Sequence, residues 1–211
     1  MGKKDLGQNK EVWTAEWDNL SPESEIQMWD FYGLRPWILK YTPRNGKILE
    51  AGCGLGRYNF YFDLFGIDTI GLDFSKKTIN FLKKWQKENN FSVDFVHGDI
   101  CNLPYKNNSL SAYLSFGVVE HFREGPQIPL LEANRVLRPG GVAIISTPSI
   151  SWNIVRQRLI RKFKDMAKFF LGRKVDRPFF QYEYTPNQLN SFVRSSGQFV
   201  TRYSGADLLY T

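Results

Sequence analysis

The chain has 211 residues, of which 42% are apolar and 23% are charged, and this composition predicts one soluble globular domain. No apolar run reaches about 18 residues, so no membrane-spanning helix is predicted. The two cysteines, Cys53 and Cys101, are too few for a disulfide framework, and with His97 and His121 they show no zinc-type spacing. We therefore expect a cytoplasmic protein without a metal site. The first 13 residues also lack the apolar core of a secretory signal.

The net charge of +7 is concentrated in one segment. Between Ser151 and Phe180 there are two acidic residues, Asp165 and Asp176, and nine basic ones, so this segment alone carries nine minus two, or seven, positive charges. The basic residues are Arg156, Arg158, Arg161, Lys162, Lys164, Lys168, Arg173, Lys174 and Arg177. The rest of the chain is neutral, so any anionic partner is expected to meet this segment.

Residues 1–45 are predicted to be helical and rich in aromatic side chains, with Ser21 capping a helix that Pro22 begins. Five apolar segments then predict strands, and they are 47–52, 68–75, 93–99, 110–117 and 141–148. The helical segments between and after them are 57–66, 76–90, 125–141 and 185–197. Strands that alternate with helices predict an α/β fold, a Rossmann-like doubly wound and mostly parallel sheet with ligands at the carboxyl ends of its strands.

The end of the chain offers one further candidate strand, residues 199–204, and only a short segment after it. Either the sheet lacks a last edge strand or the chain is a shortened version of a longer one, and an open edge could mediate a homodimer. We divide the single domain into an N-terminal helical cap (1–45), a ligand-binding core (46–148), a basic helical lid insert (149–184) and a C-terminal helix and strand (185–211).

The first predicted strand ends in a glycine-rich turn, with glycines at positions 52, 54 and 56. Alternating glycines let the backbone turn sharply and admit a ligand closely. Dinucleotide-binding folds use a G-x-G-x-x-G spacing, which this turn does not have. Glu50, two residues before the first glycine, suits a cationic amine better than a pyrophosphate.

Two further acids, Asp73 and Asp99, close the second and third predicted strands. Either one alone is as easily explained as a helix N-cap. Together with the glycine turn, Asp73 can accept hydrogen bonds from a ribose and Asp99 from the exocyclic amine of a base, with Phe74 and Ile100 beside the ring. The three acids describe a ligand with an amine, a ribose diol and an adenine, which is S-adenosylmethionine.

At this point the chain resembles the class I S-adenosylmethionine-dependent methyltransferases, in particular the small-molecule branch with the "methyltransferase type 11" pattern. The resemblance covers residues 47–148 and is carried by "ILEAGCGLGRY", "GLDFS", "HGDICNLPYKNNSL", "LSFGVVEHF" and "VLRPGGVAIISTP". One departure is Leu110-Ser111, where the family usually has Phe-Asp; we interpret that position as structural. In "LRPGG", Pro139 and Gly140 are interpreted as the bend into the fifth strand.

The resemblance implies a role for each matched position. Glu50, Gly52, Gly54 and Gly56 would hold the methionyl amino and carboxylate groups, with Cys53 as a small filler inside the turn. Asp73, followed by Phe74, would bind the ribose, and Asp99 with the Ile100 backbone would bind adenine. Ser115 and Phe116 would line the methionyl side near the sulfonium.

Methyl transfer needs an acceptor aligned behind the methyl group, and a general base when the acceptor carries a proton. His121 is the candidate base, because it follows the fourth strand on the substrate side. The alternative is that Glu120 and His121 cap or orient the next helix. A regulatory domain that binds the cofactor without transferring methyl also stays open, whereas a dehydrogenase is disfavoured by the glycine spacing.

The acceptor is expected to be a small molecule or lipid-like, chosen by Trp29, Tyr32 and Trp37 near the N-terminus and by the basic segment. That segment contains apolar residues at helical spacing, namely Trp152, Val155, Leu159, Phe163, Met166 and Phe170. The stripe predicts a cationic amphipathic helix, and three interpretations compete. The stripe packs on the domain as a lid, residues 152–177 dock on an anionic membrane or lipid, or they contact RNA in an RNA methyltransferase. Nucleic acid is disfavoured because no RNA-binding module is recognisable.

Overall fold

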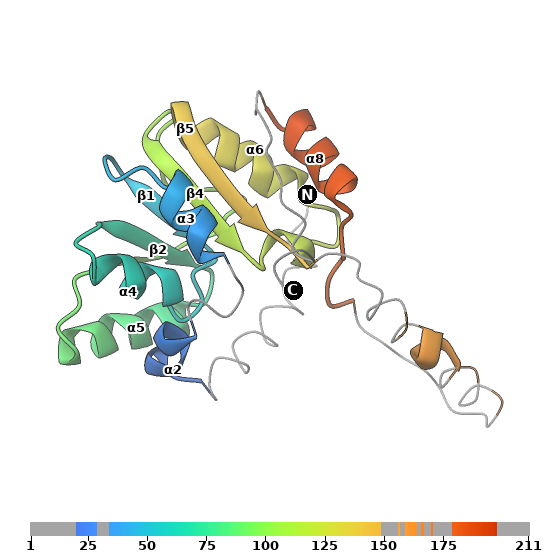
Figure 1. The fold of residues 1–211 in the computed structure, drawn as a ribbon, viewed down its shortest axis with the longest axis horizontal. Helices are drawn as coiled ribbons and strands as arrows, with labels where there is room; N and C mark the ends of the chain where they lie inside the picture. The colour runs from blue at the N-terminus through green and yellow to red at the C-terminus, as the bar shows by residue number, and fades with distance from the viewer. Residues whose placement is uncertain are drawn as a thin grey trace.

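The computed structural model describes residues 20–28, 34–148, 156, 159–163, 166, 170 and 179–197. Its centre is a five-stranded parallel sheet in the order β3-β2-β1-β4-β5 (Figure 1). The strands are β1 (Ile48–Ala51), β2 (Thr69–Asp73), β3 (Asp94–His97), β4 (Leu110–Phe116) and β5 (Leu137–Ser146). Helices cover both faces, so the predicted Rossmann-like α/β fold is confirmed.

Six described helices accompany the sheet, together with a 3-10 turn, η1 (Val119–His121). They are α2 (Pro22–Gln27), α3 (Arg35–Tyr41), α4 (Arg57–Asp63), α5 (Lys76–Glu88), α6 (Gln127–Val136) and α8 (Pro186–Ser195). Helices α3, α4 and α5 cover one face of the sheet, and α6 covers the other with α8 packed beside it (Figure 1).

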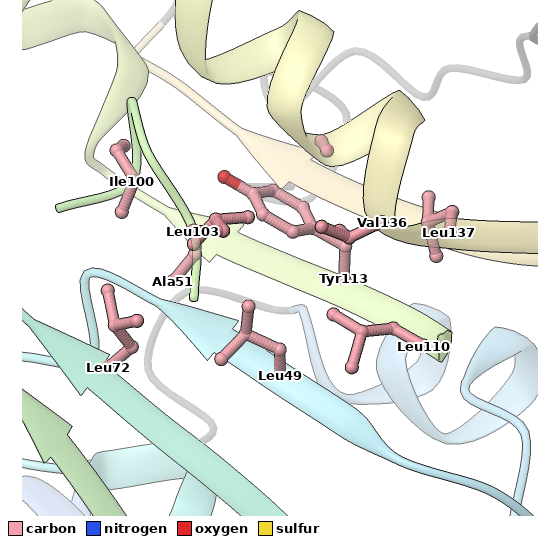
Figure 2. Close-up of a cluster of buried hydrophobic side chains, with 10 residues drawn as sticks. Leu49, Ala51, Leu72, Ile100, Leu103, Leu110, Tyr113, Val136 and Leu137 are labelled. Carbon is pink, nitrogen blue, oxygen red and sulfur yellow. The ribbon is translucent and has the colours of Figure 1, made fainter. Parts of the chain in front are cut away.

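The core lies on both faces of the central strands, because neighbouring residues of a strand point to opposite sides. In β1, Ile48 packs against Ile38 of α3 and Tyr58 of α4, whereas Leu49 packs in the cluster that Val136 of α6 joins. Figure 2 shows this second cluster filling the space between the strands and α6. A strand buried on both faces explains why β1 is recognised as an unbroken apolar run.

Helix α2 begins as predicted, with Ser21 as its N-cap in a capping box and Pro22 in the first turn. It is tied to the domain by polar contacts. The guanidinium Nε of Arg57 donates to Glu25 Oε2 at 2.8 Å, and Nε1 of Trp85 donates to Glu23 Oε1 at 2.9 Å. The N-terminal helix is therefore anchored to both α4 and α5.

Four strands fall within their predicted ranges, but β5 starts at Leu137, before the predicted start at residue 141. Leu110 pairs with Leu137, and the next pair is Ala112 with Val142, so residues 138–141 bulge out of the ladder. Gly140 adopts φ +75° in this bulge. The Pro139–Gly140 bend is real, but it lies within the strand pairing and not before it.

The packed-lid interpretation of the basic segment is wrong for the residues that the structure describes. Arg156, Met166, Phe170 and residues 159–163 are helical, and all of them are exposed. Figure 1 shows residues 159–163, in orange, lying apart from the sheet and the helices that cover it. The apolar stripe thus faces solvent at these positions.

Several predictions fall outside the described residues, namely the strand at 199–204, Trp29, Tyr32, Trp152 and Val155. Within the described ranges, no helix combines the length and the apolar character needed to cross a bilayer. The same ranges contain no group of three or more His, Cys, Asp and Glu side chains placed to hold a metal ion.

Candidate functional site

The glycine turn joins β1 to α4 and is bonded to the end of β2. Gly52, Gly54 and Gly56 adopt φ values of +81°, +50° and +75°, which side chains with a Cβ rarely adopt. The backbone N–H groups of Gly52 and Cys53 both donate to the carbonyl of Leu72, at 2.7 and 3.0 Å. The turn is therefore held against β2 in the shape that the sequence pattern predicts.

This turn lies where the strand order reverses. From β1 the chain moves outward to β2 and β3, then crosses back to place β4 on the other side of β1. In parallel α/β sheets, ligands bind at this switch point, outside the carboxyl ends of the strands. The loop after β4 closes on the turn, because a Cβ at Gly52 would lie 2.6 Å from Val118 Cγ2.

Glu50 is the most unusual side chain at this edge. It is only 4% exposed, and its Oε2 has no hydrogen-bond partner among the described residues. Burial raises the pKa of Glu50 to about 8, and the nearby charge of Arg57 opposes this only in part. A buried carboxyl with an unused oxygen is costly unless a donor arrives, and a ligand ammonium would satisfy it.

Asp73 ends β2 beside the turn. Its Oδ2 accepts from the Gly54 N–H at 3.1 Å and its Oδ1 from the Ser75 N–H at 2.8 Å. Burial nevertheless raises the pKa of this carboxyl above its usual value. Ser75, not Asp73, is the N-cap of α5, since its hydroxyl accepts from the Thr78 N–H at 3.3 Å. The helix-cap alternative therefore does not account for Asp73.

Asp99 follows β3 and shapes a local turn. Its Oδ1 accepts from the Cys101 N–H at 2.9 Å, and its backbone bridges to Asn102. Among the described residues no helix begins directly after Asp99, because the next element is β4, so Asp99 is not a helix N-cap. The Ile100 side chain packs in the core cluster of Figure 2, which leaves its backbone as the part that can meet a ligand.

The remaining predicted cofactor residues lie around the same edge. Cys53 is buried in the aromatic core, and burial raises the pKa of its thiol, which fits a filler inside the turn. The carbonyl of Phe74 lies 3.0 Å from Nε2 of His97. Ser115 is fully buried near the end of β4, and the ring of Phe116 packs against that of Tyr58 in a tilted arrangement, with ring centroids 4.4 Å apart.

His121 lies in η1, directly after β4. Its Nδ1 is 2.8 Å from the carbonyl oxygen of Phe180, and a carbonyl can only accept, so Nδ1 carries the proton of the neutral ring. The lone pair is then on Nε2, 3.9 Å from Glu120 Oε1. Burial lowers the pKa of His121, which favours this neutral form. Neither η1 nor α6 has a side-chain cap, so the capping alternative fails.

Sequence reasoning missed the environment of Glu120. Its side chain is buried, its Oε2 has no hydrogen-bond partner among the described residues, and burial raises its pKa to about 7. Residues 179–184 return to cover it: the Tyr182 N–H donates to the Glu120 carbonyl at 2.9 Å, and the Tyr182 hydroxyl donates to the Arg123 carbonyl at 2.8 Å. Only the aromatic run in this segment hinted at a buried contact.

The closeness of the turn to Val118 gives a stability prediction. A Gly52→Ala variant should be less stable than Gly66→Ala by about 1–3 kcal/mol in the free energy of unfolding, and it should therefore melt at a lower temperature. Both glycines have positive φ, +81° and +65°, but a Cβ at Gly66 would meet nothing within 4 Å. Thermal melts of the two variants therefore isolate the clash with Val118. Equal melting temperatures would contradict this packing.

Comparison with known proteins shows similarity to a family of methyltransferases. A family model described as "Methyltransferase domain" matches residues 49–145. A probable S-adenosylmethionine-dependent methyltransferase of Mycolicibacterium smegmatis is 35% identical over 102 residues, which cover 48% of this chain and 38% of that protein. A demethylmenaquinone methyltransferase of Renibacterium salmoninarum is 31% identical over 154 residues, covering 69% of this chain and 62% of the relative. The chain thus spans less than two thirds of either relative.

Among solved structures, the [4+2]-cyclase SpnF superposes with a TM-score of 0.60 at 22% identity, covering 79% of this chain and 56% of that one. A similarity at this level of identity supports the fold and leaves the reaction open.

Proposed function

Because this chain belongs to the S-adenosylmethionine-dependent methyltransferases of class I, we propose that it transfers a methyl group to an O, N or C atom of a small-molecule acceptor. The observation that carries the proposal is the buried carboxyl of Glu50, with an unused oxygen beside the glycine turn. When bound, S-adenosylmethionine supplies a methyl group on a sulfonium, whose leaving group is a neutral thioether.

The chain's own groups suit the two ends of that cofactor. Glu50 would accept from the methionyl ammonium and release its own proton to solvent. The carboxylate of Asp73 has about four acceptor positions and takes hydrogen bonds from the backbone N–H groups of Gly54, Ser75 and Phe74, so it retains a position for a ribose hydroxyl. Asp99 and the Ile100 backbone would bind adenine, and Ser115 and Phe116 would line the methionyl side.

On the acceptor side, the neutral ring of His121 takes the proton that an acceptor hydroxyl, phenol or ammonium must lose. The contact of its Nδ1 with the Phe180 carbonyl fixes the ring and directs the lone pair to Nε2. Residues 179–184 are held beside this position, because the Tyr182 N–H donates to the Glu120 carbonyl and the Tyr182 hydroxyl donates to the Arg123 carbonyl. The main contribution of the chain is to align the acceptor.

Two kinds of relative have names that state an acceptor, the demethylmenaquinone methyltransferases and a phosphoethanolamine N-methyltransferase of Arabidopsis thaliana that is 29% identical over 101 residues, and both acceptors are small molecules. We carry over only the small-molecule class. The deciding experiment is a transfer screen of the whole chain with labelled S-adenosylmethionine against phenols, acids, lipids and RNA, alongside calorimetric binding of S-adenosylhomocysteine and NAD. Binding of S-adenosylhomocysteine with labelling of a small molecule supports the proposal. Binding without transfer to any class identifies a regulatory domain, and preference for NAD overturns the cofactor.

The role of Asp73 is tested by Asp73→Asn. We expect S-adenosylhomocysteine to bind at least about tenfold more weakly, because a hydrogen bond to a charged acceptor contributes roughly 1.5–3 kcal/mol. The control is Asp68→Asn, an exposed position just before β2, which should bind as the wild type does. Thermal melts of both variants separate ligand loss from unfolding. Wild-type affinity in a folded Asp73→Asn variant would remove Asp73 from the site.

A further inference from the structure

The basic segment displays apolar side chains that a folded domain normally covers. Leu159, Phe163 and Met166 are 52%, 65% and 50% exposed, and their spacing of four and three residues places them on one side of a helix. Ile160 is exposed between them at 48%. Contiguous exposed apolar surface of this kind marks a contact site for a partner or a membrane.

The same segment carries all of the chain's excess positive charge. Arg156, Arg161 and Lys162 are exposed alongside the apolar residues. In the full sequence, residues 151–180 contain nine basic residues and two acidic ones. A helix that combines apolar side chains with lysine and arginine is typical of a segment lying in the surface of an anionic bilayer, with its apolar side among the lipid chains.

Other occupants account for only half of these features. RNA phosphates would neutralise the basic residues but leave Leu159 and Phe163 in water. A second copy of the segment would cover the apolar side chains but bring two strongly positive surfaces together. An anionic phospholipid surface satisfies both at once.

The two ends of this segment are fixed at the candidate site. It leaves from β5, whose last residue, Ser146, pairs with Phe116 at the end of β4. It returns at Phe180, whose carbonyl contacts His121, and at Tyr182, which binds the Glu120 carbonyl. A membrane that held the segment would therefore be connected to the domain at the acceptor side of the sheet.

We propose that the exposed helical residues of this segment, namely Arg156, residues 159–163, Met166 and Phe170, dock the protein on anionic phospholipid membranes and thereby tether its acceptor side near molecules dissolved in the bilayer surface. The membrane-docking proposal is supported by the exposed apolar residues and by the basic residues of the same segment. The second part rests on the proposed function and narrows the acceptor class to lipid-like molecules.

The test is flotation of the full chain with vesicles of phosphatidylcholine containing phosphatidylserine, compared with vesicles of phosphatidylcholine alone. We expect binding to the anionic vesicles at least about tenfold tighter, and weakened by salt. Phe163→Ser should reduce vesicle binding severalfold. Its matched control, Phe65→Ser, removes a phenylalanine of similar exposure, 62% against 65%, after α4 and should leave binding unchanged.

A double variant, Arg161→Gln with Lys162→Gln, should weaken binding to anionic vesicles while retaining the wild-type melting temperature. Equal binding to both vesicle types, no binding to either, or equal loss in both phenylalanine variants would overturn the docking. So would tighter binding to RNA, or a dimer that Phe163→Ser dissociates. Binding of S-adenosylhomocysteine, measured on the same samples, keeps the two proposals separate. If the full chain binds anionic vesicles but not S-adenosylhomocysteine, the proposed function is contradicted. If it binds S-adenosylhomocysteine but not anionic vesicles, this inference is contradicted.

Discussion

Replacing Glu50 by Gln should abolish measurable binding of S-adenosylhomocysteine and, at the same time, stabilise the ligand-free protein at alkaline pH. The amide keeps the shape of the side chain but cannot carry the negative charge that a ligand ammonium requires. A lost pairing with a buried charge typically costs about 3–5 kcal/mol, which is more than a hundredfold in affinity. Calorimetry with S-adenosylhomocysteine measures this loss.

The gain in stability follows from the direction of the pKa shift. Burial raises the pKa of Glu50 from 4.5 to about 8 in the folded state. Below about pH 4.5 the carboxyl is neutral in both states, and between this pH and about 8 the unfolded chain releases a proton that the folded chain retains. Stability contributed by this group therefore falls as pH rises through that window.

Each pKa unit corresponds to about 1.4 kcal/mol, so at pH 9 Glu50→Gln should raise the melting temperature by roughly 5 °C or more. The control is Glu88→Gln, since Glu88 has an exposed side chain at the end of α5. The gain should be absent at pH 4 and should disappear when saturating ligand holds the wild type. A Glu50→Gln protein that binds ligand normally would show that the ammonium is held elsewhere.

His121→Asn should lower the rate of methyl transfer to a proton-bearing acceptor by about 10²- to 10⁴-fold, while the affinity for S-adenosylhomocysteine stays unchanged. The wild-type rate should rise with pH until the ring is neutral, and it should level off below pH 7, because burial holds the pKa of His121 under its usual 6.5. The variant should lack this rise. Measurement requires the acceptor that the transfer screen identifies.

If the rise persists in His121→Asn and is centred near pH 7, the proton acceptor is Glu120, whose pKa burial raises to about 7. Glu120→Gln then removes the rise and decides between the two groups. Loss of S-adenosylhomocysteine binding in His121→Asn would instead place the imidazole in the cofactor pocket.

The sequence predicted the sheet and the glycine turn well, because both depend on local patterns. Strands such as Ile48–Ala51 are short apolar runs between turn residues, and the turn needs glycine where φ is positive. The start of β5 was missed because Leu137 pairs with Leu110 across a bulge that no local pattern announces. Pairing partners lie far apart in sequence, and their register depends on the whole sheet.

The chemistry at the site was predicted only in part, for the same physical reason. Sequence position placed Glu50 and Asp73 at strand ends. It did not show that Glu50 is buried with an unused oxygen, or that the carboxylate of Asp73 already accepts a hydrogen bond from the Gly54 backbone. Periodicity predicted an amphipathic helix around Phe163 without showing whether its apolar side is covered. Burial is a property of the tertiary structure, so both outcomes required the fold.

The ion pair between Arg57 and Glu25 carries the electrostatic surroundings of the candidate site beyond the residues that the family model matches. Arg57 lowers the pKa of Glu50, and Glu25 partly cancels that effect from α2. A fragment trimmed to residues 49–145, the part that the family model matches, would lose Glu25 and leave the guanidinium to act on Glu50 alone. Its Glu50 would ionise at lower pH, and the ligand's ammonium would have to compete with the Arg57 guanidinium for the Glu50 carboxylate. The charges that set the pKa of Glu50 thus include a residue, Glu25, that lies outside the range matched by the family model.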